Sequence, residues 1–205
     1  MPRLLPLLAA LPFLLSPALA QDLSYARIQT SMGDIDVALE AERAPATTEN
    51  FLTYAKGGYY DRLVFHRVVP GRLIQGGGYT QRLRPRAARD PIPNEASNGL
   101  SNLRGTIAMA RLADPDSATS QFYLNLSDNT DLDRTGDAFD FEAGYTVFGR
   151  IVAGQDVADA IGAVPTGPGP DHSPFASEVP VEPVLILRID PIEADEVGET
   201  QEDTP

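Results

Sequence analysis

The residues best placed to do chemistry lie in the stretch FHRVVPGRLIQGGG, which begins at Phe65. If the two apolar parts of this stretch form strands, alternation places Phe65 and Arg67 on one face of the first strand. The same alternation places Leu73 and Gln75 on one face of the second strand. Arg67 then offers a permanently charged donor beside apolar and carboxamide side chains.

Two further segments place polar and apolar side chains with the same spacing. Ala110 and Leu112 share a face of one predicted strand. Gln121 and Tyr123 share a face of the next one. If all these faces coincide, one guanidinium, two carboxamides, an aromatic ring and small aliphatic groups meet on a shallow surface. The set holds no acid, hydroxyl nucleophile or phosphate cradle, so it suits a reaction in which no bond is broken.

The composition excludes several classes of protein. The 205 residues include no Cys and only two His, which excludes disulfide frameworks, thiolate zinc sites, cysteine nucleophiles and multi-histidine metal centres. We therefore expect no metal and no cofactor. The formal net charge of −13 argues against nucleic acid as a partner. Residues 62–111 form an exception, a basic band with nine Arg against two acidic residues.

The first twenty residues read as an export signal rather than as part of the fold. Arg3 precedes the apolar run 4–15, and small residues at 18 and 20 suit a signal peptidase. The run is about 12 residues long, whereas a membrane span needs about 20. We expect residues 1–20 to be removed, leaving an exported chain without a membrane anchor that begins at Gln21.

The rest of the chain reads as about eight strands and two helices. Short runs rich in Val, Ile, Leu and aromatic residues predict the strands. Helices are predicted at 46–56 and 155–161, each followed by glycine. This pattern favours an all-β domain built as a closed barrel, which leaves no exposed strand edge. The predicted strands are 24–30, 34–39, 63–69, 72–76, 105–112, 121–126, 145–150 and 184–189.

The connections and the end of the chain carry their own expectations. Ser31-Met32-Gly33 predicts a tight hairpin connection, and the glycines at 76–78 predict a tight turn. A Pro/Gly-rich loop is predicted at 165–183. The domain is expected to span 21–192, and the acid-rich segment 193–205 is predicted to be disordered.

Several sequence blocks, in order along the chain, resemble the cyclophilins. Details such as AMAR at 108–111 and DSATSQ at 116–121 are similar to the exported bacterial branch. The resemblance implies an eight-stranded antiparallel barrel with a helix at each end. It also implies peptidyl-prolyl cis-trans isomerase activity. The matching blocks are FHRVVPG at 65–71, QGGG at 75–78, NE at 94–95, NGL at 98–100, GTIAMAR at 105–111, SQFY at 120–123 and VFG at 147–149.

The resemblance implies a folding function outside the cytoplasm. We expect a periplasmic monomer whose partners are proline-containing, unfolded or partly folded polypeptides, which it assists during folding. We hypothesise that the basic band puts positive potential around the substrate groove and favours acidic residues beside the target proline. The alternative is that these arginines are solvated on unrelated faces.

Arg67 is the residue that the resemblance assigns to catalysis. Rotation about the amide has a barrier of about 18–20 kcal/mol, and the prolyl nitrogen becomes a hydrogen-bond acceptor only when the bond is twisted. A charged donor aimed at that nitrogen binds the twisted state best. One preorganised donor is worth roughly 2.7–4 kcal/mol, whereas a ~10⁵-fold acceleration needs about 7 kcal/mol. A pocket must supply the remainder by desolvating the proline ring and holding the flanking backbone.

A wider set of residues is expected to bind the substrate. Within it we favour a structural hydrogen-bonding role for His66 over proton transfer, because alternation places it opposite Arg67. The expected substrate-binding residues are Phe65, His66, Arg72, Leu73, Gln75, Ala110, Arg111, Leu112, Gln121, Tyr123, Leu132 and Tyr145.

Four positions depart from the familiar eukaryotic cyclophilin pattern. Arg72 and Tyr123 stand where phenylalanines are usual, Asp131 where a tryptophan often lies, and Tyr145 where a histidine is common. These departures motivate an alternative interpretation, a proline-peptide binding module or chaperone of the same fold with little turnover. A secreted hydrolase is a third class, but the chain has no Gly-x-Ser-x-Gly motif.

Overall fold

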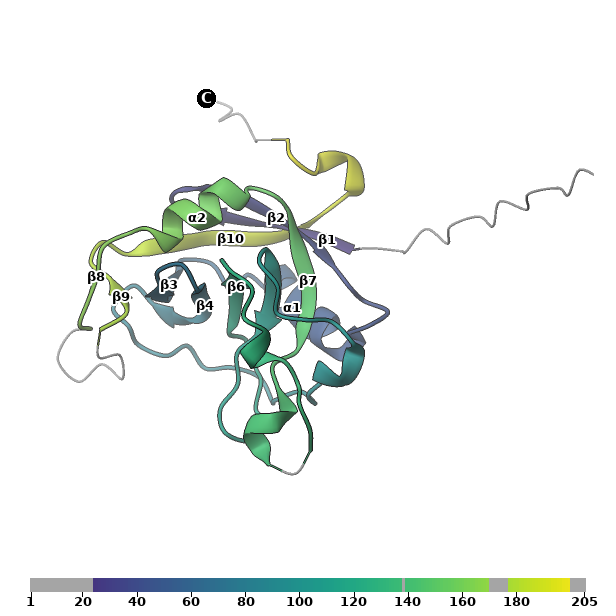
Figure 1. The fold of residues 1–205 in the computed structure, drawn as a ribbon. Coiled ribbons are helices and arrows are strands. Elements are labelled where there is room, and N and C mark those ends of the chain that lie inside the picture. The colour runs from purple at the N-terminus through teal and green to yellow at the C-terminus, as the bar shows by residue number, and fades with distance from the viewer. Residues whose placement is uncertain (1–23, 138, 170–176, 200–205) are drawn as a thin grey trace, which may run out of the picture.

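The computed structural model describes residues 24–137, 139–169 and 177–199 (Figure 1). Eight of its strands form a closed antiparallel barrel in the order β1-β10-β3-β4-β6-β5-β7-β2, which confirms the predicted fold class. The predicted signal peptide lies outside the described residues. The barrel strands are β1 (Ser24–Thr30), β2 (Gly33–Leu39), β3 (Leu63–Val69), β4 (Leu73–Thr80), β5 (Thr106–Met109), β6 (Phe122–Asn125), β7 (Val147–Ala153) and β10 (Val184–Ile192).

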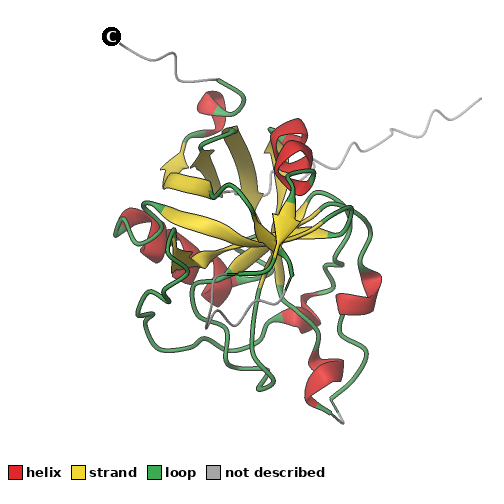
Figure 2. Cartoon of the chain, turned by 90° about the vertical axis from the view of Figure 1, so that its left-hand side faces the viewer, coloured by secondary structure: helices red, strands yellow, loops and turns green. Residues whose placement is uncertain are grey.

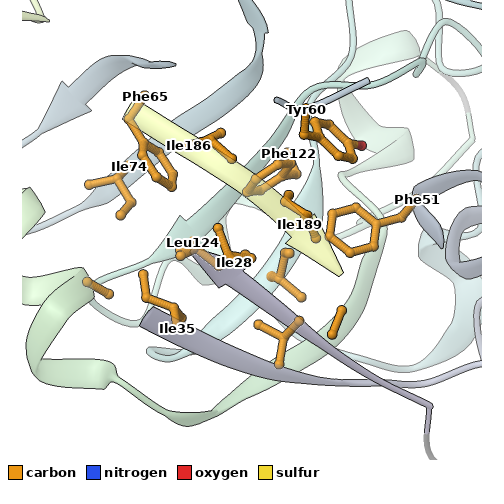
Figure 3. Packing of buried hydrophobic residues seen from close by; sticks show 14 of the residues in the cluster. Ile28, Ile35, Phe51, Tyr60, Phe65, Ile74, Phe122, Leu124, Ile186 and Ile189 are labelled. Carbon is orange, nitrogen blue, oxygen red and sulfur yellow. The ribbon is translucent and has the colours of Figure 1, made fainter. Parts of the chain in front are cut away.

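The barrel closes around an apolar core that alternate residues of the strands supply. In β6, for example, Phe122 and Leu124 point into this core, while Tyr123 between them does not belong to it. Figure 3 shows the side chains meeting from strands far apart in sequence, such as Ile28 and Ile186. Each large apolar side chain buried in this way contributes about 1.5–3 kcal/mol. The period of two therefore gives every barrel strand a second, outward face.

Two helices pack on the barrel at the predicted positions, α1 (Pro45–Lys56) and α2 (Gln155–Gly162). Figure 2 shows them on the periphery of the strands. Phe51 of α1 and Ile161 of α2 are fully buried in the core. The first turn of α1 has free backbone N–H groups, and the carboxylate of Glu95 accepts hydrogen bonds from two of them. Glu95 thereby ties the 94–100 segment to the helix.

The glycine run at 76–78 is part of β4, so the predicted tight turn there was wrong. Gly77 has a φ of +83°, which other residues rarely adopt. A Cβ atom on Gly78 would lie 2.5 Å from Cγ of Gln121. The glycines serve close packing between β4 and the 120–122 segment, and the strand continues through them. The hairpin between β1 and β2 forms at Thr30 and Gly33 as predicted.

The Pro/Gly-rich segment 165–183 contains a small sheet that the sequence did not indicate. Its strands are β8 (Thr166–Gly167) and β9 (Val179–Pro180), and they pair antiparallel. In Figure 1 this sheet lies near the start of β10, at the side of the barrel where β3 runs. Just before β9, the carbonyl of Glu178 accepts a hydrogen bond of 2.7 Å from the backbone N–H of Val68. The segment is therefore attached to β3.

The expected disorder from residue 193 does not hold for the described part, which ends at 199. Residues 194–196 form a short 3-10 helix. The guanidinium of Arg27 donates to the carbonyl of Glu196 at 2.7 Å, and the N–H of Gly198 donates to Asp36 at 2.8 Å. Acidic composition predicted solvation, but these backbone contacts with a buried ion pair hold the segment on the barrel. Within residues 24–137, 139–169 and 177–199, no helix has the length and apolar character needed to cross a membrane.

Candidate functional site

The outward faces of four strands form a second, smaller apolar cluster, here called the groove cluster. Leu73, Ala108, Tyr123 and Val147 are its buried members, and they come from β4, β5, β6 and β7. Strand alternation explains the set, because each neighbours a residue that points into the barrel core. The rings of Tyr123 and Tyr145 meet edge to face at 6.0 Å between centroids. The partly buried side chains that pack on the cluster are Val69, Leu100, Ala110, Leu132 and Tyr145.

A row of polar side chains borders the groove cluster across β3, β4 and the start of β6. Gln75 lies opposite Arg67 on one side and Tyr123 on the other in the strand register. The guanidinium Nη1 of Arg67 donates to Oε1 of Gln75 at 3.4 Å, and Nε2 of Gln75 donates to Oε1 of Gln121 at 3.1 Å. The structure thus brings together the guanidinium and the two carboxamides that the sequence singled out.

The catalytic candidate Arg67 also has an acidic partner that sequence reasoning missed. Its Nε atom donates to Oε2 of Glu178 at 2.5 Å. The two side chains are 35% and 39% exposed, so the pair lies at the solvent boundary. Glu178 is 111 residues away, inside the loop predicted at 165–183, so no local pattern pointed to it. The backbone bond between Val68 and Glu178 is what brings it to Arg67.

Phe65 does not belong to this surface, which corrects its expected role. The pairing of β3 with β4 shifts register between Phe65 and Arg67, so simple alternation fails there. The Phe65 ring points into the barrel and meets the Phe122 ring edge to face at 6.2 Å (Figure 3). The irregularity lets Phe65 fill the core while Arg67 reaches the outer surface.

His66 is buried beside the same surface, on the side of Gln121 rather than away from it. Burial is the main cause that lowers the pKa of its imidazole to about 4, although hydrogen bonds to the Val64 backbone and the Gln121 side chain raise it. The ring lies 4.6 Å from that of Tyr79. His66 is therefore neutral at pH 7 and supports Gln121, an arrangement that fits a structural hydrogen-bonding role.

Arg111 and Leu112 differ in their relation to the groove cluster. The Arg111 guanidinium lies 4.7 Å from the centre of the Tyr145 ring and donates to the carbonyl of Gly144 at 2.8 Å. It also donates to the carbonyls of residues 112, 113 and 140, so it braces the 133–144 loop. Leu112 is 77% exposed and does not pack on the cluster. Its expected place on the surface was wrong, because β5 ends at Met109.

Two of the four departures from the eukaryotic pattern pair with each other. Nη2 of Arg72 donates to Oδ2 of Asp131 at 2.6 Å, with both side chains largely exposed. This ion pair lies beside the apolar pocket wall, since Leu73 and Leu132, the next residues in the chain, belong to that wall. A polar contact therefore stands where the familiar pattern has two aromatic residues.

The departure at Tyr123 leaves the wall of the groove apolar. Its hydroxyl donates to Oδ1 of Asn102 at 2.8 Å in the interior. Burial raises the pKa of the Tyr123 phenol well above its usual value, so the hydroxyl stays neutral. The extra oxygen relative to phenylalanine is satisfied away from the groove. Asn102 is a supporting residue that the sequence did not reveal, because its partners are set by the fold.

The residues that the structure describes contain no group of three or more His, Asp or Glu with metal-binding geometry. The arrangement of the site is instead a half-exposed guanidinium beside a shallow apolar cluster. Such a surface can hold an apolar ring and donate hydrogen bonds to a group next to it.

Comparisons with known proteins agree with this geometry. Residues 25–190 match the family model described as cyclophilin type peptidyl-prolyl cis-trans isomerase/CLD. The chain is 44% identical to peptidyl-prolyl cis-trans isomerase A of Dickeya dadantii over 172 residues, which covers 83% of this chain and 86% of the relative. It is 45% identical to peptidyl-prolyl cis-trans isomerase B of Escherichia coli over 160 residues, which covers 78% and 94%.

The likeness extends to solved structures. A crystal structure of a cyclophilin type peptidyl-prolyl cis-trans isomerase from Cryptosporidium parvum superposes with a TM-score of 0.66 at 24% identity, covering 83% of this chain and 98% of that one. At that identity the superposition shows the shared fold. Together with the family match and the bacterial relatives, it shows that the chain belongs to the cyclophilin-type peptidyl-prolyl cis-trans isomerases.

Proposed function

We propose that this enzyme isomerises X-Pro bonds in exported polypeptides while they fold, and that it does so in the periplasm as a monomer. The observation that carries the catalytic part is the half-exposed guanidinium of Arg67 beside the groove cluster. In support, a second crystal structure of the Cryptosporidium parvum protein, with a TM-score of 0.65, was determined in the presence of the dipeptide Ala-Pro. We infer that proline-containing peptides bind here as well.

In the proposed mechanism the proline ring lies against the groove cluster, where Leu73, Tyr123 and Leu132 provide apolar contact. Nη2 of Arg67 then donates to the prolyl nitrogen, whose lone pair becomes available as the bond twists. The donor binds the twisted state better than either planar isomer, so it lowers the barrier. Gln75 and Gln121 border the same surface and hold the flanking peptide backbone.

The activity is tested with a refolding reaction that is limited by proline isomerisation. We expect the wild type to accelerate the slow phase and Arg67→Ala to lose a factor of about 10²–10³ in kcat/KM, as for one preorganised donor. Its free energy of unfolding should change little, because the side chain is half-exposed. Arg188→Ala is the matched control, since Arg188 is more exposed and pairs with Asp190 on β10. An Arg67→Ala variant as active as this control would refute the assignment of Arg67.

The alternative, a proline-peptide binding module or chaperone with little turnover, is favoured by one observation. The Arg72–Asp131 ion pair, at 2.6 Å, places two charged side chains beside Leu73 and Leu132, where the familiar pattern has two aromatic residues. The same assay separates the two functions. A wild type that binds proline peptides and leaves the slow phase unchanged would establish the alternative.

The cellular location rests on the sequence of residues 1–20. Cell fractionation and N-terminal sequencing of the purified protein test it. We expect a periplasmic product that begins at Gln21. An uncleaved product in the cytoplasm would refute the export proposal and leave the catalytic one intact.

A further inference from the structure

The geometry points to Glu178 as the residue that positions the guanidinium of Arg67 for catalysis. This inference rests on the proposed function, in which Arg67 donates to the prolyl nitrogen. Glu178 accepts a hydrogen bond of 2.5 Å from Nε of Arg67. Among the ion pairs of the described residues, this is the one that involves the proposed catalytic donor.

The guanidinium is held at two of its three nitrogens. Glu178 binds Nε, and Gln75 binds Nη1 at 3.4 Å through its Oε1 atom. Because the guanidinium is planar, two attachments at different nitrogens fix its plane. Within the described residues, Nη2 and the second N–H of Nη1 donate to no other group, so they remain available to a substrate. Nη2 is the donor that the proposed mechanism uses.

The orientation of the Gln75 side-chain amide is fixed by its hydrogen bond to Gln121. Its amide nitrogen donates to Oε1 of Gln121 at 3.1 Å, so its amide oxygen faces Arg67. Gln75 alone makes only a long contact with Arg67. The short contact with Glu178 is therefore the main restraint on the guanidinium.

Glu178 can act in this way because its backbone is fixed to the strand that carries Arg67. Its carbonyl accepts the N–H of Val68 at 2.7 Å, and the following residues form β9. The backbone of Glu178 is therefore held in a defined position beside β3, from which its carboxylate reaches Arg67. A side chain on an unattached loop would hold the guanidinium less well.

The Glu178 carboxylate also reduces the positive charge of the site. This effect would lower the activity, so it opposes the positioning of the Arg67 guanidinium. Both side chains are more than one-third exposed, so water screens their charges strongly. The orientation of the guanidinium depends on the hydrogen bond to Nε, which water weakens less than it weakens the effect of the charges. We therefore expect the positioning effect to dominate, and removal of Glu178 to lower the turnover.

The test compares Glu178→Ala and Glu178→Gln with the control Glu182→Ala. The control removes an exposed glutamate from the same segment, so it makes the same change in charge. NMR exchange measurements on a proline peptide, below and at saturation, give kcat and KM separately. We expect Glu178→Ala to lower kcat roughly tenfold with KM little changed, as for a misplaced catalytic group. Glu178→Gln keeps an acceptor for Nε, so it should recover most of the lost kcat, and Glu182→Ala should behave as wild type.

The outcomes that overturn the inference are distinct. If kcat of Glu178→Ala equals or exceeds that of wild type, the carboxylate does not position Arg67. If Glu178→Gln loses as much kcat as Glu178→Ala, an acceptor for Nε at this position is not what supports catalysis, and the inference fails. In an Arg67→Ala background, Glu178→Ala should cause no further loss, and a further loss would place its action elsewhere. A wild type without isomerase activity would overturn the proposed function as well, whereas an active wild type confines any failure to Glu178.

Discussion

Two arginine–carboxylate pairs, whose arginines lie on different strands of the barrel, differ in their burial and in the number of bonds between their side chains. In the first, Arg27 of β1 and Asp36 of β2 are 5% and 3% exposed and bind through two bonds of 2.7 and 2.9 Å. In the second, Arg67 and Glu178 are 35% and 39% exposed and share a single short bond. The same two chemical groups therefore occur once buried, with two bonds between them, and once at the solvent boundary, with a single bond.

The difference indicates that the buried Arg27–Asp36 pair serves the stability of the fold, whereas the exposed Arg67–Glu178 pair serves the proposed reaction. A buried ion pair must satisfy its hydrogen bonds internally, because each unpaired donor there is costly. In Arg27, Nε and Nη2 donate to the Asp36 carboxylate, and Nη2 also donates to the Glu196 carbonyl. Arg67 lies where water or a substrate can complete its bonding. The N–H groups of Arg67 that do not bind Glu178 or Gln75 can bind water, so they cost the fold little. The same N–H groups can bind the substrate in the proposed reaction.

The largest effect is expected from removal of Asp36, which tests whether the buried pair stabilises the fold more than an exposed pair does. Asp36→Ala leaves the buried Arg27 guanidinium without its carboxylate, so we expect the free energy of unfolding to fall by about 3–5 kcal/mol. Urea unfolding followed by circular dichroism measures it. Asp34→Ala is the control, because Asp34 lies 3.9 Å from the same guanidinium and is partly exposed. A loss below about 1 kcal/mol, as for a surface pair, would remove the distinction between the two pairs.

His66 sharpens the comparison, because it neighbours Arg67 in β3 yet is as buried as Arg27. Its pKa is about 4 when folded and 6.5 ordinarily, so between these values only the unfolded chain binds the proton. The free energy of unfolding is therefore highest above pH 6.5 and falls as the pH decreases toward 4. At about 1.4 kcal/mol per unit the loss reaches about 3 kcal/mol.

Urea unfolding between pH 7 and pH 4 checks this prediction. His66→Gln should remove about that much of the pH dependence relative to wild type, since a glutamine does not titrate in this range. Carboxylates titrate in both proteins, so the difference between them isolates His66. Equal slopes for the two proteins would show that the imidazole is not held neutral by the fold.

The smallest expected effect concerns the charge of residues beside the target proline. Arg67 and Arg72 each face a carboxylate, and Arg111 is bound to backbone carbonyls. The positive potential expected from the basic band is therefore largely offset at the groove. We expect kcat/KM for peptides with Glu or Lys beside proline to differ by less than about threefold, even at low salt. A larger preference for Glu would restore the original hypothesis.

Much of the architecture could be predicted because it depends on local patterns. Runs rich in Val, Ile, Leu and aromatic residues predicted the strands at 24–30 and 63–69 with their observed bounds. Alternation also placed Leu73, Gln75 and Tyr123 on a common surface, and the structure brings them together. These features depend on side-chain direction along a regular strand, which a sequence records directly.

The features that escaped prediction depend on contacts between distant parts of the chain. The irregular pairing at Phe65 reverses the alternation, and a sequence carries no sign of it. Glu178 reaches Arg67 through a hydrogen bond to β3 from a segment that read as a loop. The segment at 193–199 is held by Arg27 and Asp36, whose buried position is set by the closed barrel. Tertiary structure decides each of these cases.

The order of the strands has a consequence for how the chain reaches its final form. β10, at Val184–Ile192, pairs with both β1 and β3, so it fills the gap between the earliest strands. A polypeptide emerging from a ribosome or a translocation channel, amino terminus first, has an open sheet until this last piece arrives. The barrel therefore cannot close until almost the whole domain is available, and until then β1 and β3 lack their shared partner strand. An enzyme that would speed the maturation of other chains is itself committed to maturing late.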